Sequence, residues 1–193
     1  MTGQNVSEAF AVNKEEEAVR NAYGRSEIGQ RALLARRLIE AGVHFVGIEY
    51  RPESSNGGGW DYHSEIFRWM PVAATPFDRA IAALVNDLDN KGLLDQVLVL
   101  AFGEFGRTYK VNKDAGRDHQ PEVGSVVMAG AGVAGGIIYG ASDSRGASVK
   151  SKPISPADLL ATVYNILGFP PDTRIYDKVG RGIFISEGNP IQI

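Results

Sequence analysis

The spacing of apolar residues along the chain predicts several amphipathic helices. The clearest covers residues 152–168, where Ser155 can cap the helix, Pro156 fits its first position and Gly168 ends it. Gly24, Gly42 and Gly92 follow the other three helical patterns as stop signals. The pattern therefore predicts helices over residues 14–24, 26–42, 74–91 and 152–168.

Short runs of β-branched and aromatic residues between these helices predict strands. The run "QVLVLAFG" (96–103) is continuously apolar, which is typical of a central strand covered on both faces. Further strands are predicted at 43–50, 124–130, 137–140 and 182–185. A charged segment of roughly 18 residues separates two of them, which is longer than most connections in compact domains.

The alternation of helices and strands predicts an α/β sandwich with a largely parallel sheet, built as a single domain over residues 1–193. In such folds ligands bind at the carboxyl ends of the strands. The segment "GWDYH" (59–63) follows one predicted strand, and "GEFGRT" (103–108) follows another. We therefore expect both segments at the same rim of the sheet.

Composition narrows the function classes. The formal net charge of -3 gives no reason to expect nucleic acid or an anionic membrane as partner. No run is apolar and long enough to span a bilayer, and no signal peptide is visible, so localisation stays open. Cysteine is absent, so any metal has to be held by His, Asp or Glu.

The candidate chemistry lies at the predicted rim. Asp61 and His63 stand two positions apart, so in an extended stretch both side chains point to one side. His119 follows Asp118, and one of the two could bind a metal while the other orients it. Glu104 is a further candidate oxygen ligand. Three basic residues could hold an anionic oxygen: Arg107, Lys110 and Arg117.

Purely structural interpretations of the same residues remain open. The Asp-x-His pattern is common by chance, and His63 could cap the next helix. The pair Asp118–His119 could simply fix a turn, and Arg107 could pair with Glu104. Two more residues are interpreted as packing residues without a functional role: His44 and Trp60.

The ordered segments "GGWDYH", "GEFGRT", "GRDH" and "SPADL" resemble the bacterial DUF1501 family, which is related to sulfatases and the alkaline phosphatase superfamily. The resemblance covers nearly the whole chain. It implies a three-layer α/β/α sandwich with metal at the carboxyl ends of the strands. It also implies that Asp61, His63 and His119 form one metal site, with zinc the expected ion and manganese or calcium as alternatives.

The resemblance also exposes departures. It assigns Glu104 to a second metal site, but Phe105 stands where many relatives have a ligating histidine, so that site looks altered or lost. Asp118 and Arg117 are interpreted as residues that support the ligands, and Arg107 as an anion contact. Relatives carry an additional amino-terminal strand region with the expected nucleophile. This chain starts downstream of it, so its sheet edge would need cover from that portion or from a second copy.

These expectations lead to one main function and two alternatives. The main one is a metal-dependent hydrolase acting on a small anionic phosphate or sulfate ester, with reduced activity if the nucleophile is absent. The first alternative is a non-catalytic domain that keeps one ion for stability. The second is phosphate binding by the glycine-rich turn "GAGVAGG" (130–136), which is followed by a strand-like run rather than a helix.

Overall fold

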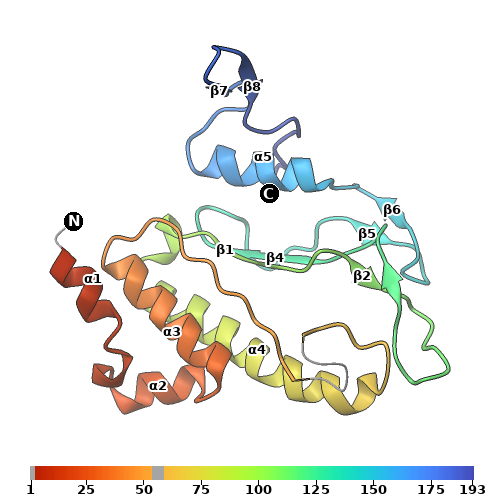
Figure 1. The fold of residues 1–193 in the computed structure, drawn as a ribbon, viewed down its shortest axis with the longest axis horizontal. Coiled ribbons are helices and arrows are strands. Elements are labelled where there is room, and N and C mark those ends of the chain that lie inside the picture. Colours follow the sequence, from red (N-terminus) through yellow and green to blue (C-terminus); the bar gives the residue numbers. More distant parts are fainter. Residues whose placement is uncertain (1–2, 54–58) are drawn as a thin grey trace.

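The computed structural model describes residues 3–53 and 59–193, and Figure 1 shows helices packed beneath short strands. The helices are α1 (Gly3–Ala9), α2 (Glu17–Tyr23), α3 (Glu27–Glu40), α4 (Ile66–Asn90) and α5 (Pro156–Ile166), with 3-10 turns η1 (Val12–Lys14) and η2 (Leu94–Gln96). The strands are β1 (Val99–Phe102), β2 (Gly106–Arg107), β3 (His119–Gln120), β4 (Val126–Ala129), β5 (Ala141–Ser142), β6 (Val149–Ser151), β7 (Arg174–Tyr176) and β8 (Gly182–Phe184).

The main core lies where α2, α3 and α4 pack together and meet β1. Ser26 caps α3 by accepting a hydrogen bond from the backbone N–H of Gly29, as Ser commonly does at this position. The predicted helix is confirmed, but Ile28, Ala32 and Leu33 form its face in the core, and the apolar residues Leu34, Leu38 and Ile39 are only partly buried outside it. The buried members of this core are Tyr23, Ile28, Ala32, Leu33, Ala80, Leu84, Leu88 and Val99.

Helix α4 begins well before the predicted residue 74. It runs through Pro71 and Pro76, although proline removes a helix hydrogen bond and disfavours a helix interior. Packing explains the difference, because Ile66 and Ala73 are buried against Tyr62 in a second apolar cluster. Tertiary burial therefore outweighs the two helix-breaking residues and extends the helix towards residue 65.

A buried guanidinium cross-links the helical layer. Arg36 of α3 is only 1% exposed, and its Nη2 lies 2.9 Å from Oε2 of Glu15. Its Nε lies 2.9 Å from Oδ2 of Asp87 in α4, and it also pairs with Glu40. The Tyr23 hydroxyl of α2 donates to the same Asp87 carboxylate at 2.9 Å. One cation thus ties three helices and the segment before α2 together.

The strands do not form the predicted parallel sheet, so the α/β/α sandwich is wrong. Among the described residues the strands form four two-stranded antiparallel pairs: β1 with β4, β2 with β3, β5 with β6, and β7 with β8. Parallel pairing requires a long crossover, usually a helix. The charged segment after β1 instead folds back through β2 and β3, and β4 returns beside β1 with Leu100 opposite Met128.

Two further predicted strands are absent from the described residues. Residues 43–50 form no strand and pass in an extended path over α3 and α4 (Figure 1). Phe45 in this stretch is exposed. Residues 137–140 also form no strand, and the chain pairs only afterwards, at β5. Their apolar, β-branched composition is the same as that of a buried strand, so the sequence pattern alone could not separate the two states.

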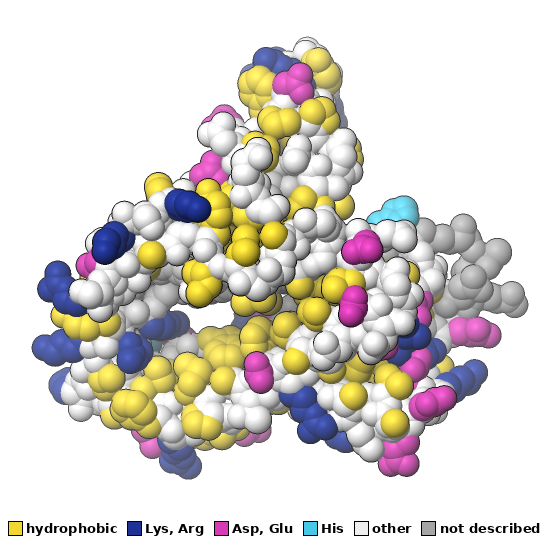
Figure 2. Space-filling model, turned by 180° about the vertical axis from the view of Figure 1, so that it is seen from behind, with side chains coloured by type: hydrophobic (Ala, Val, Ile, Leu, Met, Phe, Trp, Pro, Cys, Tyr) yellow, Lys and Arg dark blue, Asp and Glu magenta, His cyan; other side chains and the backbone are white. Residues whose placement is uncertain are grey.

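The carboxyl-terminal part stands on the other side of β1 and β4 from the helical layer (Figure 1). Its helix α5 confirms the predicted start: Ser155 and Asp158 form a reciprocal capping box with Pro156 at the first turn. Hydrophobic side chains collect between this part and the rest of the molecule in Figure 2. Phe102 and Val127 of the β1–β4 pair are exposed. Cover of this surface by a second chain stays a prediction.

None of the described helices combines the length and apolarity that crossing a membrane requires.

Replacing Arg36 should destabilise the helical layer strongly. In Arg36→Met the carboxylates of Glu15, Glu40 and Asp87 lose their shared cation while still partly buried. Breaking a buried ion network in this way costs about 3–5 kcal/mol. Urea unfolding followed by circular dichroism measures the change. The matched control is Arg51→Met, whose pair with Glu49 is largely exposed and is worth at most about 1 kcal/mol. Equal effects in the two variants would contradict the assigned role.

The same network predicts a loss of stability in acid. Burial alone would raise the pKa of Glu15 and of Glu40. The hydrogen bonds and charge of Arg36, together with those of Arg37 at Glu15 and of Lys91 at Glu40, outweigh burial and leave each pKa below its ordinary value of 4.5. A carboxyl group whose pKa is lower in the folded state stabilises the protein above the unfolded pKa. That contribution disappears as the pH falls through the folded pKa. Unfolding free energies measured from pH about 6 down to about 3 should therefore fall, and they should fall less steeply in Arg36→Met.

Candidate metal centre

The first half of the candidate site is the turn before α4. Tyr62 is 2% exposed and packs with Ile66, whereas its neighbours Asp61 and His63 point away from that cluster. Tyr62 is buried within this turn, whereas the flanking side chains stay open to solvent, with Asp61 54% and His63 38% exposed. The local sequence thereby presents a carboxylate and an imidazole on one face.

The second half is the charged segment between β1 and β4. Strand β2 pairs with β3 so that Arg107 lies opposite His119. Thr108 fixes the same bend, since its N–H donates to the carbonyl of Asp118 at 2.9 Å and its hydroxyl accepts from the N–H of Asp118 at 3.1 Å. The long loop is thus folded into a small, hydrogen-bonded unit that carries His119 at its base.

The two halves meet through a close backbone contact at Gly116. The N–H of Arg117 donates to the carbonyl of Tyr62 at 2.9 Å, and Ser64 forms a bridge with Ala115. A Cβ atom at Gly116 would lie 2.0 Å from the carbonyl carbon of His63, a distance that real Cβ atoms do not reach. Only glycine fits between the two backbones, so Gly116 sets how closely the histidines approach each other.

Three potential ligand atoms converge at this contact. Nε2 of His119 lies 2.9 Å from Oδ1 of Asp61, and Nε2 of His63 lies 3.0 Å from the same oxygen. The two Nε2 atoms are 3.1 Å apart. The structure therefore brings His119 to Asp61 and His63, although more than fifty positions separate it from either residue and the predicted parallel sheet does not exist.

The triangle has the size of a metal site. With metal–ligand bonds of about 2.0–2.1 Å, two ligand atoms of a tetrahedral zinc site lie about 3.3 Å apart. The observed separations of 2.9, 3.0 and 3.1 Å are slightly shorter. A proton can lie between only one pair of these basic atoms at a time, whereas a divalent cation would contact all three. Asp61, His63 and His119 therefore fit such an ion, and half-exposed side chains leave the site open to solvent.

Arg107 competes for the same carboxylate. Its Nη1 lies 2.6 Å from Oδ1 of Asp61 as an ion pair, but that buried nitrogen has no aligned hydrogen-bond partner among the described atoms. The pKa of the Asp61 carboxyl is lowered mainly by its hydrogen bond with His119, with further lowering by Arg107. Among the described residues Arg107 pairs with Asp61 and not with Glu104, the alternative partner that the sequence offered.

A second carboxylate orients His63 from behind. Oδ1 of Asp118 lies 2.9 Å from Nδ1 of His63, on the opposite side of the ring from Asp61. The pKa of Asp118 is lowered by hydrogen bonds from His63 and then from Asn112. With the Nδ1 proton directed at Asp118, Nε2 of His63 carries the lone pair that faces the triangle. The carboxylate–histidine pairing is the arrangement found behind many metal ligands.

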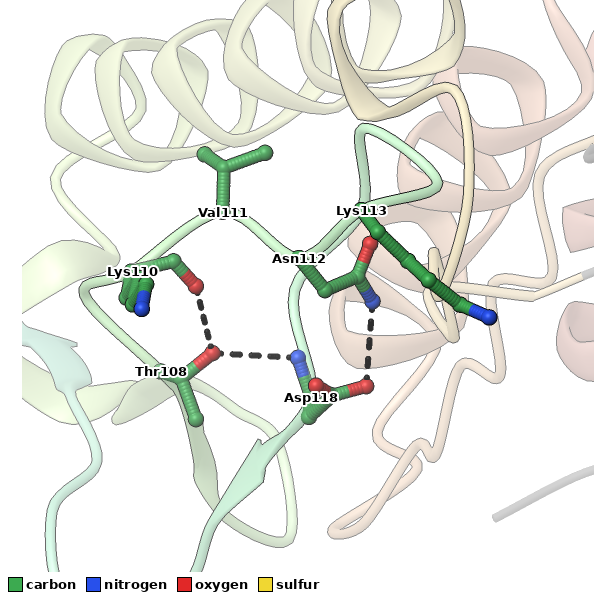
Figure 3. Close-up of a pocket in the computed structure, with 6 residues that line it drawn as sticks. All are labelled: Thr108, Lys110, Val111, Asn112, Lys113 and Asp118. Carbon is green, nitrogen blue, oxygen red and sulfur yellow. Dashed lines mark hydrogen bonds between the residues drawn. The ribbon is translucent and has the colours of Figure 1, made fainter.

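Other predicted residues lie outside the triangle. Glu104 is exposed and does not belong to the cluster. Arg117 donates to the carbonyls of Thr108 and Tyr109, so its charge supports the loop instead of facing an anion. Lys110 lines a neighbouring shallow pocket with five other residues: Thr108, Val111, Asn112, Lys113 and Asp118 (Figure 3).

The remaining interpretations divide similarly. Trp60 is a packing residue, as predicted, with its ring 5.6 Å from that of Phe77. His44 is exposed, so the interpretation as a packed residue is wrong. His63 does not cap α4, because the N-cap residue is Glu65. The ring of Phe105 lies 4.5 Å from that of His119. An aromatic side chain therefore packs beside the site at the position where the resemblance implied a ligating histidine in many relatives.

Sequence reasoning missed Asn112 and Gly116. Asn112 binds Asp118 and the carbonyl of His63, while Gly116 permits the close contact. Glycine and asparagine are both common in loops, so the residue type alone does not distinguish these two positions. Only the Gly-Arg-Asp-His spacing hinted that a glycine close to His119 had a special place.

The comparisons identify one family. A family model described as "Protein of unknown function (DUF1501)" matches residues 2–192. No curated protein and no solved structure matches the chain.

Adding a methyl group at Gly116 should push the two halves apart. Gly116→Ala places Cβ on the backbone of His63, and overpacking of this kind costs about 1–3 kcal/mol. Chemical unfolding measures the loss. Gly135→Ala is the control, because a Cβ there meets no atom within 4 Å. Comparable stability of both variants would show that the backbones can separate without cost.

Proposed function

The chain belongs to the DUF1501 family, and we propose that it is a metal-dependent hydrolase-like domain acting on phosphate or sulfate esters. The observation that carries the proposal is the convergence of Asp61 Oδ1, His63 Nε2 and His119 Nε2. The likeness of its motifs to those of sulfatases and the alkaline phosphatase superfamily supplies the substrate class.

Three protein ligands favour a reactive rather than a purely structural site. Structural zinc sites are generally closed by four protein ligands, whereas catalytic ones keep one position for water or substrate. The triangle of Asp61, His63 and His119 would leave such a position on its solvent side. A divalent ion held there would polarise an ester oxygen or activate water.

The surrounding residues supply binding and orientation. Arg107 is next to the triangle, where its Nη1 pairs with Asp61, and its partly exposed guanidinium can offer its other N–H groups to an anionic oxygen of the ester. Asp118 accepts the Nδ1 proton of His63 and keeps Nε2 free for the ion. Phe105 covers one side of His119 and limits water there. These residues position the ester, but none is assigned as nucleophile.

A non-catalytic, single-ion domain is the second candidate. Phe105 and the exposed Glu104 favour it, because the part of the chain that the structure describes contains no second cluster of three or more His, Asp or Glu ligands. In that case the ion only stabilises the contact between the two loop segments. The two candidates share the ion and differ in turnover.

Zinc binding and ester hydrolysis test both candidates. Zinc at one hundred times its Kd should stabilise the wild type by about 2.7 kcal/mol, seen as a higher Tm. Hydrolysis of nitrophenyl phosphate or nitrophenyl sulfate should depend on added zinc, manganese or calcium. His119→Ala should lose both effects, because it removes one side of the triangle.

His44→Ala is the matched control, since His44 is exposed and lies outside the cluster. It should behave as wild type. Stabilisation by zinc without turnover would establish the non-catalytic candidate. If zinc neither stabilises the protein nor supports hydrolysis, and wild type and His119→Ala are indistinguishable, the proposed metal site is wrong. An anomalous-scattering map should contain a single ion bound by these three residues.

A further inference from the structure

Asn112 uses both ends of its side-chain amide between the two halves of the site. Its Oδ1 accepts from the N–H groups of Asp114 and Gly116 at 3.0 and 2.9 Å. Its Nδ2 donates to the carbonyl of His63 at 3.0 Å and to Oδ1 of Asp118 at 3.2 Å. Figure 3 shows the bond from Asn112 to Asp118. One side chain thus shapes the loop and reaches across to the backbone of His63 and to the carboxylate of Asp118.

The bond to Asp118 matters because little else restrains that carboxylate. The Asp118 side chain is 56% exposed, so water competes for both of its oxygens. Its Oδ1 nevertheless contacts Asn112 and Nδ1 of His63 at the same time. A fixed amide donor on one side of the oxygen leaves its other lone-pair direction aimed at the imidazole.

We propose that Asn112 is a positioning residue, which acts through Asp118 to hold His63 in the tautomer with its proton on Nδ1. In this tautomer Nε2 of His63 presents a lone pair to Asp61 and His119. The effect of Asn112 on metal binding rests on the proposed function, whereas its effect on the tautomer of His63 does not. Asn112 touches no reacting group itself.

Asparagine is suited to this position by its chemistry. Its oxygen is required as acceptor for the two loop N–H groups, and its NH2 group is required as donor for two oxygens. Aspartate has nearly the same shape but has no donor, and it would place a second negative charge against Asp118. Asn112→Asp therefore keeps the acceptor that shapes the loop, removes the donor to Asp118 and to the carbonyl of His63, and adds a negative charge beside Asp118.

The test uses the full chain and begins without metal. Ring-nitrogen NMR shifts of His63, recorded in mildly alkaline buffer, report which nitrogen carries the proton. Wild type should have the proton on Nδ1. Asn112→Asp and Asp118→Ala should both shift His63 towards a mixture of tautomers. Lys113→Ala, at the next position in the loop, should leave the spectrum unchanged.

Zinc titration gives the second readout. Both Asn112→Asp and Asp118→Ala should weaken zinc binding about 10- to 100-fold, the usual effect of removing a group that orients a ligand. If Asn112 acts through Asp118, most of the Asn112→Asp effect should vanish when Asp118 is already alanine. Unchanged tautomer and unchanged zinc affinity in Asn112→Asp would overturn the proposal.

The two proposals fail in different ways. If wild type does not bind zinc but His63 changes tautomer in Asn112→Asp, the metal site fails and the positioning role stands. If wild type binds zinc and Asn112→Asp matches it in both readouts, only the positioning role fails. Should Asn112→Asp not fold, Asp118→Ala alone decides: an unchanged His63 tautomer in that variant would also overturn the proposal.

Discussion

The candidate site depends on the contact between two loop backbones. Residues 59–65 and 112–118 approach so closely that only glycine fits at position 116. The backbone bond from Arg117 to Tyr62 fixes the register of that approach. The distances from His119 to Asp61 and to His63 follow from this register, because His119 belongs to a different segment from the other two residues. A shift of one residue would turn His63 or His119 away, since neighbouring side chains of an extended segment point to opposite faces.

The helical layer contributes to this contact only indirectly. Arg36 and its carboxylate partners fix α3 against α4, and α4 in turn holds Tyr62 through Ile66 and Ala73. Tyr62 then presents Asp61 and His63 to solvent. Asp61 and His63 are therefore held by the packed helices, whereas His119 lies on a loop that is held largely by its own hydrogen bonds. This division agrees with a general pattern, in which functional groups are carried on loops above a packed scaffold.

The sequence predicted which side chains meet at the candidate site better than it predicted the architecture. Asp61, His63 and His119 could be chosen because carboxylates and imidazoles are ordinary metal ligands and because the resemblance to the DUF1501 family implied this set. Helices such as α3 and α5 could be placed because periodicity and capping are local properties. The sheet could not be predicted, because residues 43–50 and 96–103 have similar apolar composition but only part of the second run pairs. Pairing depends on where a distant segment returns, and no local pattern encodes that return.

The separation of the two halves along the chain has a consequence for how the site forms. His63 and His119 are brought together only after a loop closes around all of α4 and β1, which is a contact of large sequence separation. Such contacts form late, after local helices have appeared. The imidazole pair is therefore a marker of completed folding. Early helical intermediates would hold the same residues apart, with no shared cavity for a cation to enter.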